Sequence, residues 1–214
     1  MEAYQQLMHT LTLTMGASWA SGLNLYATLA VLGISAATGN AQLPPNLQIL
    51  ANPLVIGAAC LMYVVEFFAD KIPGLDTAWD GVHTFIRIPA GALLAAGAVG
   101  DVTPALQIAA GILGGGIAGV THATKAGSRV IINASPEPFS NWAASITEDL
   151  AVIGGLWAAL HYPLIFIGLF VLFILFVIWL LPKIARGIKQ IFRFIGRLFG
   201  GGKAAETASS NSED

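Results

Sequence analysis

The sequence predicts an all-α fold: a bundle of six membrane-spanning helices followed by an amphipathic helix. Of its 214 residues, 56% are hydrophobic and only 10% are charged, whereas soluble domains carry about 25% charged residues. Apolar segments near the 20 residues that cross a bilayer recur between Pro and Gly breaks. We therefore expect one transmembrane bundle over residues 1–182. The chain offers no broad basic surface for nucleic acid, and its single cysteine excludes an internal disulfide.

The first three spans are expected at residues 11–37, 52–68 and 82–99. Hydroxyl and amide side chains interrupt the first span and place Asn24 near mid-membrane. These side chains suit either close helix packing or the lining of a polar path, and both interpretations stay open. The second span ends in a charged stretch that Pro73 interrupts. The third span is short and rich in Ala and Gly, which favours a place inside the bundle.

The last three spans are expected at residues 105–121, 142–160 and 164–181. Glycines four residues apart in the fourth span are typical of a helix on which a neighbouring backbone lies closely. The sixth span is almost wholly Leu, Ile, Phe and Val and ends near Trp179, a residue type common at the membrane interface. This helix is the one we expect to face lipid.

The pattern changes after Pro182. Over residues 183–199, apolar side chains fall on one helical face and basic side chains on the other. This pattern predicts an amphipathic helix lying in the headgroup plane as an anchor, with a protein-docking role as the alternative. Residues 200–214 begin with three glycines and continue as a polar tail, which predicts disorder.

The positions of the basic residues predict an orientation. All ten Lys and Arg residues follow the second, fourth or sixth expected span. Since cytoplasmic loops carry the excess of Lys and Arg, six spans place both termini in the cytoplasm. The expected location is the cytoplasmic (inner) membrane of a bacterium.

The two halves of the chain show a weak similarity. GLNLYATLAVLG in the first half resembles GVTHATKAGSRV in the second, and each precedes a Pro-containing break and a span with a glutamate, Glu66 or Glu148. Three spans per half would make two inverted repeats, a plan found in many transporters. Against this interpretation, both glutamates lie toward the cytoplasm instead of at mirrored depths.

Charged residues gather in the stretch EFFADKIPGLDTAWDGVHTFIR, residues 66–87. Asp80, His83 and Arg87 share one helical face, and three later residues repeat the same spacing. The expected topology brings both groups to the cytoplasmic ends of spans two to five, where Asp70 can pair with a base of the second group. The predicted charge network or anion-binding set comprises Asp70, Lys71, Asp80, Arg87, Lys125, Arg129 and Asp149.

These residues support three kinds of function. A transporter or channel for a small ion or solute would use coupling carboxylates and proton relays, for which the candidates are Glu66, Glu148, His83, His122 and Asn24. A membrane-embedded metal-dependent or lipid-phosphate-handling protein would use Asp76, Asp80 and His83 as metal ligands. In a structural or partner-binding membrane protein, the same charges would be salt bridges and helix caps. Expected partners are the lipid bilayer and a small ion or solute, with a homo-oligomer as a further option. The sequence leaves the cofactor unknown, and it favours a protein without enzymatic activity over a membrane-embedded enzyme.

The segments EFFADKIPGLDTAWDGVHTF, HATKAGSR and NASPEPFSNW together resemble a bacterial multi-pass membrane family that is known only as a domain of unknown function. The resemblance covers roughly residues 15–160. It implies a six-span inner-membrane protein and implies no activity, cofactor or functional residue.

Overall fold

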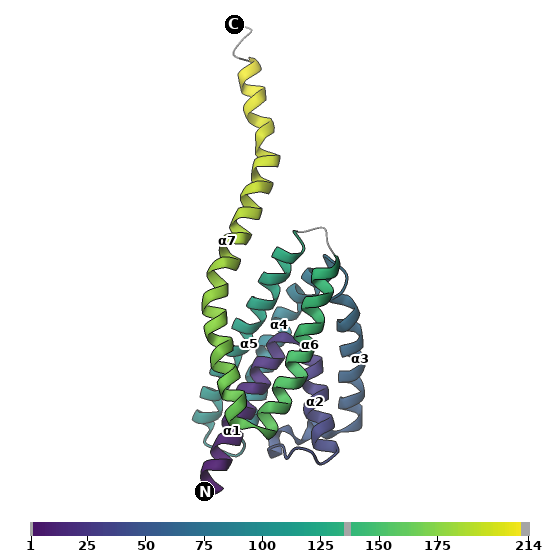
Figure 1. Cartoon of the computed structure of the whole chain (residues 1–214), viewed down its shortest axis with the longest axis vertical. Coiled ribbons are helices and arrows are strands. Elements are labelled where there is room, and N and C mark those ends of the chain that lie inside the picture. The colour runs from purple at the N-terminus through teal and green to yellow at the C-terminus, as the bar shows by residue number, and fades with distance from the viewer. Residues whose placement is uncertain (1, 135–137, 211–214) are drawn as a thin grey trace.

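The computed structural model describes residues 2–134 and 138–210, without the side chains of Pro138, Ile195 and residues 197–210. The described residues form helices and no strand. Most of these helices pack in one bundle, and the last one projects far beyond it (Figure 1). The elements are α1 (Glu2–Leu23), α2 (Leu25–Ala37), the 3-10 helix η1 (Pro45–Ala51), α3 (Pro53–Ala69), α4 (Leu75–Ala98), α5 (Pro104–Ile132), α6 (Pro138–His161) and α7 (Pro163–Ser210).

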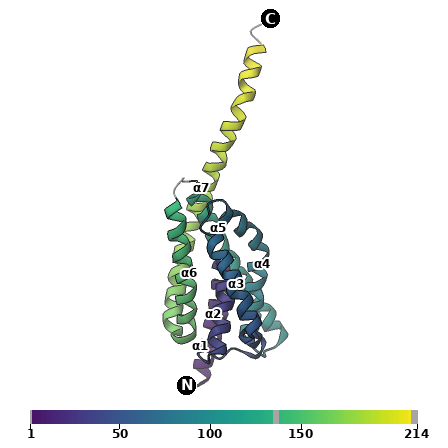
Figure 2. The ribbon, with the colours of Figure 1, turned by 90° about the vertical axis from the view of Figure 1, so that its right-hand side faces the viewer.

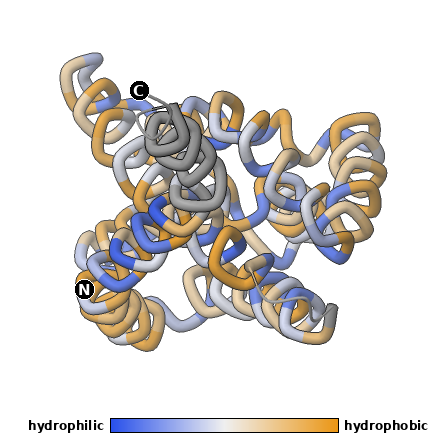
Figure 3. Tube along the Cα trace, turned by 90° about the horizontal axis from the view of Figure 1, so that it is seen from above, coloured by the Kyte–Doolittle hydropathy of each residue, from blue (hydrophilic) through white to orange (hydrophobic). Residues whose placement is uncertain are grey.

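Three described helices are long and apolar enough to cross a membrane, at Pro104–Ile132, Phe139–His161 and Pro163–Phe194. A fourth candidate is the pair η1 and α3, which bend by 67° at the break between them. Hydrophobic residues lie all around the periphery when the bundle is seen from above (Figure 3). Apolar helices with apolar outer surfaces indicate a membrane-embedded protein.

The first expected span is two helices instead of one. α1 ends at Leu23, and Asn24 takes an extended conformation (φ −148°, ψ 100°) in which its side chain accepts a hydrogen bond from Ala27 N at 2.9 Å. α1 runs into the bundle from the N-terminal end and α2 returns to that end (Figures 1 and 2). A cavity of about 1080 Å³ at this end is lined both by Thr10 of α1 and by Asn40, which follows α2.

This hairpin corrects the prediction of a single span over residues 11–37. The physical reason is that an Asn side chain can cap a new helix, so a buried polar residue marks a helix start as readily as a packing contact. α3 to α7 then alternate in direction, and the two ends of the chain lie at opposite ends of the bundle (Figure 1). The prediction of six spans with both termini on one side is therefore not confirmed.

The expected inverted repeat also lacks support. The first half contains the α1–α2 hairpin and the bent pair of η1 and α3. In the second half, α5, α6 and α7 each run unbroken through the described residues. The helix breaks of the first half therefore have no counterpart in the described helices α5, α6 and α7.

Close packing of α1, α4 and α5 forms the middle of the bundle. A Cβ atom added at Gly114 of α5 would lie 2.9 Å from the carbonyl oxygen of Gly91 in α4 and would overlap the Cβ of Ala95. The Ser18 hydroxyl of α1 donates to the same Gly91 oxygen at 3.3 Å. Small residues thus let three helices approach closely, as the glycine spacing predicts.

α7 continues without a break through the boundaries expected at Pro182 and Gly200. A proline inside a helix removes one hydrogen bond and bends the helix without necessarily ending it. Past Pro182 the helix still packs on α5, because a Cβ at Gly127 would overlap the side chain of Ile184. The backbone is helical through Ser210, and residues 211–214 of the expected disordered tail lie outside the described residues.

Candidate functional site

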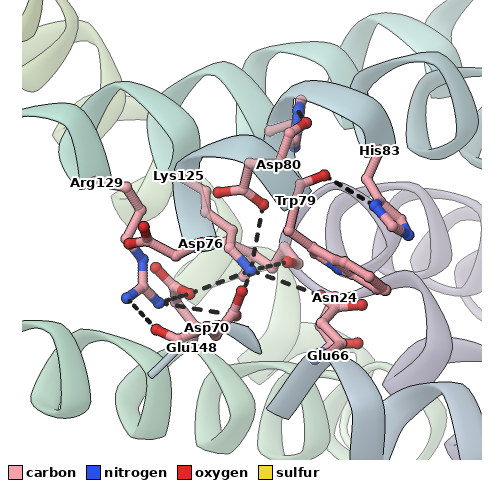
Figure 4. Close-up of polar contacts among 12 residues, drawn as sticks. Asn24, Glu66, Asp70, Asp76, Trp79, Asp80, His83, Lys125, Arg129 and Glu148 are labelled. Atoms are coloured by element: carbon pink, nitrogen blue, oxygen red, sulfur yellow. Dashed lines mark hydrogen bonds and ion pairs between the residues drawn. The ribbon is translucent and has the colours of Figure 1, made fainter. Parts of the chain in front are cut away.

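Charged side chains from four helices meet inside the end of the bundle opposite the N-terminus (Figure 4). In three places, two charged residues lie one or two helical turns apart and therefore share a face. These pairs are Glu66 and Asp70, Asp80 and Arg87, and Lys125 and Arg129. Almost all of these side chains are inaccessible to solvent. We call the set the ionic network; its members are Glu66, Asp70, Asp80, Arg87, Lys125, Arg129 and Glu148.

Arg87 joins α3, α4 and α5. Its guanidinium donates to Glu66 Oε1 at 2.5 Å and to Asp80 Oδ1 at 2.9 Å. It also lies 3.0 Å from His122 Nδ1, which must accept because an arginine can only donate. The other nitrogen, Nε2, is then the donor in a 2.7 Å contact with the Thr84 hydroxyl. This arrangement assigns His122 the neutral form with its proton on Nε2.

Arg129 joins α5 to α6 and to the end of α3. It donates to Glu148 Oε2 at 2.7 Å and to both the side chain and the backbone carbonyl of Asn141, at 2.5 Å and 3.0 Å. A further bond reaches the Asp70 carbonyl at 3.2 Å. Hydrogen bonds of a charged donor are about twice as strong as neutral ones, so Arg129 fixes the relative position of three elements.

Lys125 lies at the centre of the ionic network (Figure 4). Its ammonium donates to Asp70 Oδ2 at 2.7 Å and to the Leu23 carbonyl oxygen at 3.1 Å. The Leu23 oxygen is available because the Ala27 N–H, its partner in an unbroken helix, donates to the Asn24 side chain instead. The turn between α1 and α2 therefore supplies a backbone ligand to a buried charge.

A second group of contacts borders the ionic network. Asn24 Nδ2 donates to Asp149 Oδ1 at 3.1 Å. Lys71, just after α3, donates to the Ser145 hydroxyl at 3.3 Å, and its ammonium lies 3.0 Å from the centre of the Phe67 ring. Burial lowers the pKa of the Lys71 ammonium, and the carboxylates of Asp149 and Asp70 oppose that shift.

The expected metal ligands do not come together. Asp76 accepts from Asn133 Nδ2 at 2.8 Å and so ties the start of α4 to the end of α5. Asp80 pairs with Arg87, while His83 stacks on Trp79 and contacts the Tyr26 hydroxyl at 3.1 Å. No group of three or more His, Cys, Asp or Glu side chains in the described part of the chain is arranged to hold a metal ion.

The charges of the ionic network do not balance. Its three bases face four acids, so one negative charge is in excess. Among the described atoms, Glu66 Oε2, Asp70 Oδ1 and Asp80 Oδ2 are buried without a hydrogen-bond partner. A buried carboxylate oxygen without a donor is costly. This arrangement is chemically suited to holding one more proton or small cation.

Sequence reasoning missed several partners of these residues. Ser145 and Asn141 fall four and eight residues before the predicted Asp149 on α6 and all three are buried, so these two residues could have been found from the spacing. Tyr26 and the carbonyl of Leu23 carry no such signal, because both reach the site only through the helix break.

No curated protein matches the chain, and no solved structure does. One family model covers residues 11–183, most of the chain, and agrees with the resemblance found in the sequence. The chain belongs to the family described as Domain of unknown function (DUF4126).

Proposed function

We propose that the protein is a transporter or channel for a small ion or small solute, with the ionic network on its path. The observation that carries the proposal is the turn at Asn24, which brings the Leu23 carbonyl, released from its helical partner, and a polar side chain to buried charges. Broken helices inside membrane proteins place such groups at ion and substrate sites, and irregular backbone within a membrane is tolerated where protein or a cavity surrounds it.

The free-energy cost of burying the ionic network supports the same role. Ionisable residues within membrane helices are expensive and usually mark ion pathways or proton relays. In this proposal Glu66 and Glu148 are the coupling or selectivity carboxylates. They approach Lys125 Nζ from different helices, with Oε1 of Glu66 at 3.6 Å and Oε2 of Glu148 at 3.5 Å. His122, held by Arg87 and Thr84, and His83 are the candidates for proton relay.

The distribution of bases suggests an orientation for this transporter. No Lys or Arg precedes Lys71, and the N-terminal end of the bundle is correspondingly free of them. The positive-inside rule then assigns the N-terminus to the outside and the C-terminus to the cytoplasm of a bacterial inner membrane. We propose five spans and one re-entrant hairpin, α1–α2.

Flux in proteoliposomes tests the proposal. We expect proton or ion flux under an imposed pH or salt gradient with the wild-type protein, and its loss in Glu66→Gln and Glu148→Gln. Glutamine keeps the volume and one acceptor oxygen, so both variants should still fold. The matched control is Glu2→Gln, an exposed glutamate outside the ionic network, which should retain flux. Wild-type flux from both network variants would refute the assignment of these carboxylates.

The pairing of the bases favours a second candidate, a structural or partner-binding membrane protein. Arg87 and Arg129 each contact two carboxylates of the ionic network. In that role, Glu66→Gln would lower the thermal midpoint, and no gradient would drive flux through the wild-type protein. The two measurements together separate the candidates.

A further inference from the structure

We propose that the position of the Lys125 ammonium is a binding site for a small monovalent cation, at which Lys125 and the cation replace one another. The proposal rests on the transport function above and names its substrate class. Its evidence is the oxygen cage around Lys125 Nζ, the charge of that cage and the origin of its backbone ligand.

Five oxygen atoms surround Lys125 Nζ. Asp70 Oδ2 lies at 2.7 Å and the Leu23 carbonyl at 3.1 Å. Carboxylate oxygens of Glu148, Glu66 and Asp80 follow at 3.5, 3.6 and 3.7 Å. An ammonium has three N–H groups, so the cage offers more oxygens than Lys125 can bond. A set of oxygens from several helices, one of them a backbone carbonyl, is the environment that hard monovalent cations take in transporters.

The cage also carries more negative charge than its bases neutralise. Glu66, Asp70 and Asp80 each turn one oxygen toward Lys125 and keep a second, buried oxygen without a hydrogen-bond partner. These side chains are at most 3% exposed. Removal of the Lys125 charge would leave two negative charges uncompensated among buried atoms. Unpaired buried carboxylates are costly, so such a site takes up a cation of the right size in competition with protons.

The break between α1 and α2 also places a partial negative charge next to Lys125 Nζ. Leu23 is the last residue of α1, and the C-terminus of a helix carries a partial negative charge that favours cations. Because Asn24 diverts the Ala27 N–H, the Leu23 oxygen has no helical partner and accepts from Lys125 instead. Entry of a cation then requires that Lys125 leave the cage, which couples occupancy of the site to movement of one side chain.

Cation binding to Lys125→Ala in detergent tests the proposal without any flux measurement. The probe is methylammonium chloride, which matches the end of the lysine side chain, titrated against thermal unfolding in N-methylglucamine buffer. We expect the midpoint of Lys125→Ala to rise saturably with methylammonium, as ligand binding to the folded state requires. We expect an apparent Kd at least about tenfold lower than in the wild type, where Lys125 competes. Tetramethylammonium, which is too large for the cage, should have no such effect.

Lys71→Ala is the matched control, because Lys71 is also buried but contacts Ser145 and Phe67 outside the cage. It should show the wild-type response. The same response in Lys71→Ala as in Lys125→Ala, or no saturable response in Lys125→Ala, would overturn the proposal.

Folding of the variant is itself informative. If Lys125→Ala folds only when methylammonium is present, the proposal is supported. If Lys125→Ala fails to fold in the presence of every cation tested, while the double variant Lys125→Ala/Asp70→Asn folds, Lys125 is a structural counter-ion and the proposal is overturned. Flux through the wild-type protein without a methylammonium response in Lys125→Ala would support the transport function and refute this cation site. A methylammonium response without flux would support the cation site and refute the transport function.

Discussion

The two ends of the bundle are built from the same helices but held together by different interactions. Toward the N-terminal end, α4 buries Gly91, Leu94, Ala95 and Ala98, and Gly114 of α5 packs against Gly91 and Ala95. Toward the other end, the same stripe of α4 buries Asp80 and Arg87. The first end depends on close contact of small residues, and the second on the pairing of charges.

The comparison shows how each end specifies the structure. Close helix contact is set by volume and is sensitive to one added methyl group. A buried charge network is set by pairing, and removing one member leaves its partners uncompensated. The α1–α2 hairpin spans both ends, because Ser18 contacts Gly91 and Leu23 contacts Lys125. Because the loss of a buried charge leaves its partners uncompensated, we expect substitutions at the charged end to lower the stability of the fold more than an added methyl group does.

The largest loss of stability is expected from Arg87→Gln. It removes the guanidinium that bonds Glu66 and Asp80, both fully buried, and breaking a buried ion pair typically costs about 3–5 kcal/mol. The thermal midpoint in detergent, together with the yield of monodisperse protein, measures the effect. Arg186→Gln on the exposed part of α7 is the control. Equal midpoints for the two variants would show that the charged end does not depend on pairing.

A smaller loss is expected from Gly114→Ala at the apolar end. The added Cβ would overlap Ala95 and approach the Gly91 oxygen at 2.9 Å, and such overpacking costs about 1–3 kcal/mol. Gly116→Ala, two residues away, adds a Cβ with nothing within 4 Å. It should leave the midpoint unchanged or raise it slightly. A larger loss at Gly116 than at Gly114 would mean that α4 and α5 do not pack as described.

The smallest of the three losses is expected from Asn24→Ala, which removes the cap of α2. Loss of such a cap costs about 1 kcal/mol. Asn24→Ser keeps a capping oxygen but gives up the amide that donates to Asp149. Serine should therefore restore most of the midpoint, and any remaining difference reports the bond to Asp149. No recovery with serine would argue that Asn24 does not act as a cap.

The charged end could be predicted from the sequence to the extent that helical spacing determines it. The spacing of Asp80 and Arg87 on α4, and that of Lys125 and Arg129 on α5, places each pair on one face, and the structure brings these faces together. Pairing of Asp70 with Lys125 or Arg129 also followed from their shared end of the bundle.

The hairpin could not be predicted in the same way. Residues 11–37 are apolar enough in aggregate for one span, and the break depends on a capping bond, Ala27 N–H to Asn24, that hydropathy does not register. The orientation that Lys and Arg suggest depends on this hairpin. The absence of bases before Lys71 is equally compatible with an outside N-terminus once α1 and α2 are counted as one re-entrant unit.

Labelling of single cysteines from either side of the membrane tests the hairpin most directly. Cys60 is the only native cysteine and is replaced by Ala. New cysteines are placed at the exposed positions Glu2, Asn40 and Phe192. With a membrane-impermeant maleimide on oriented vesicles, we expect the first two to react from one side and the third from the other. Labelling of positions 2 and 40 from opposite sides would mean that residues 11–37 cross the membrane once, and would contradict the hairpin and the site built on it.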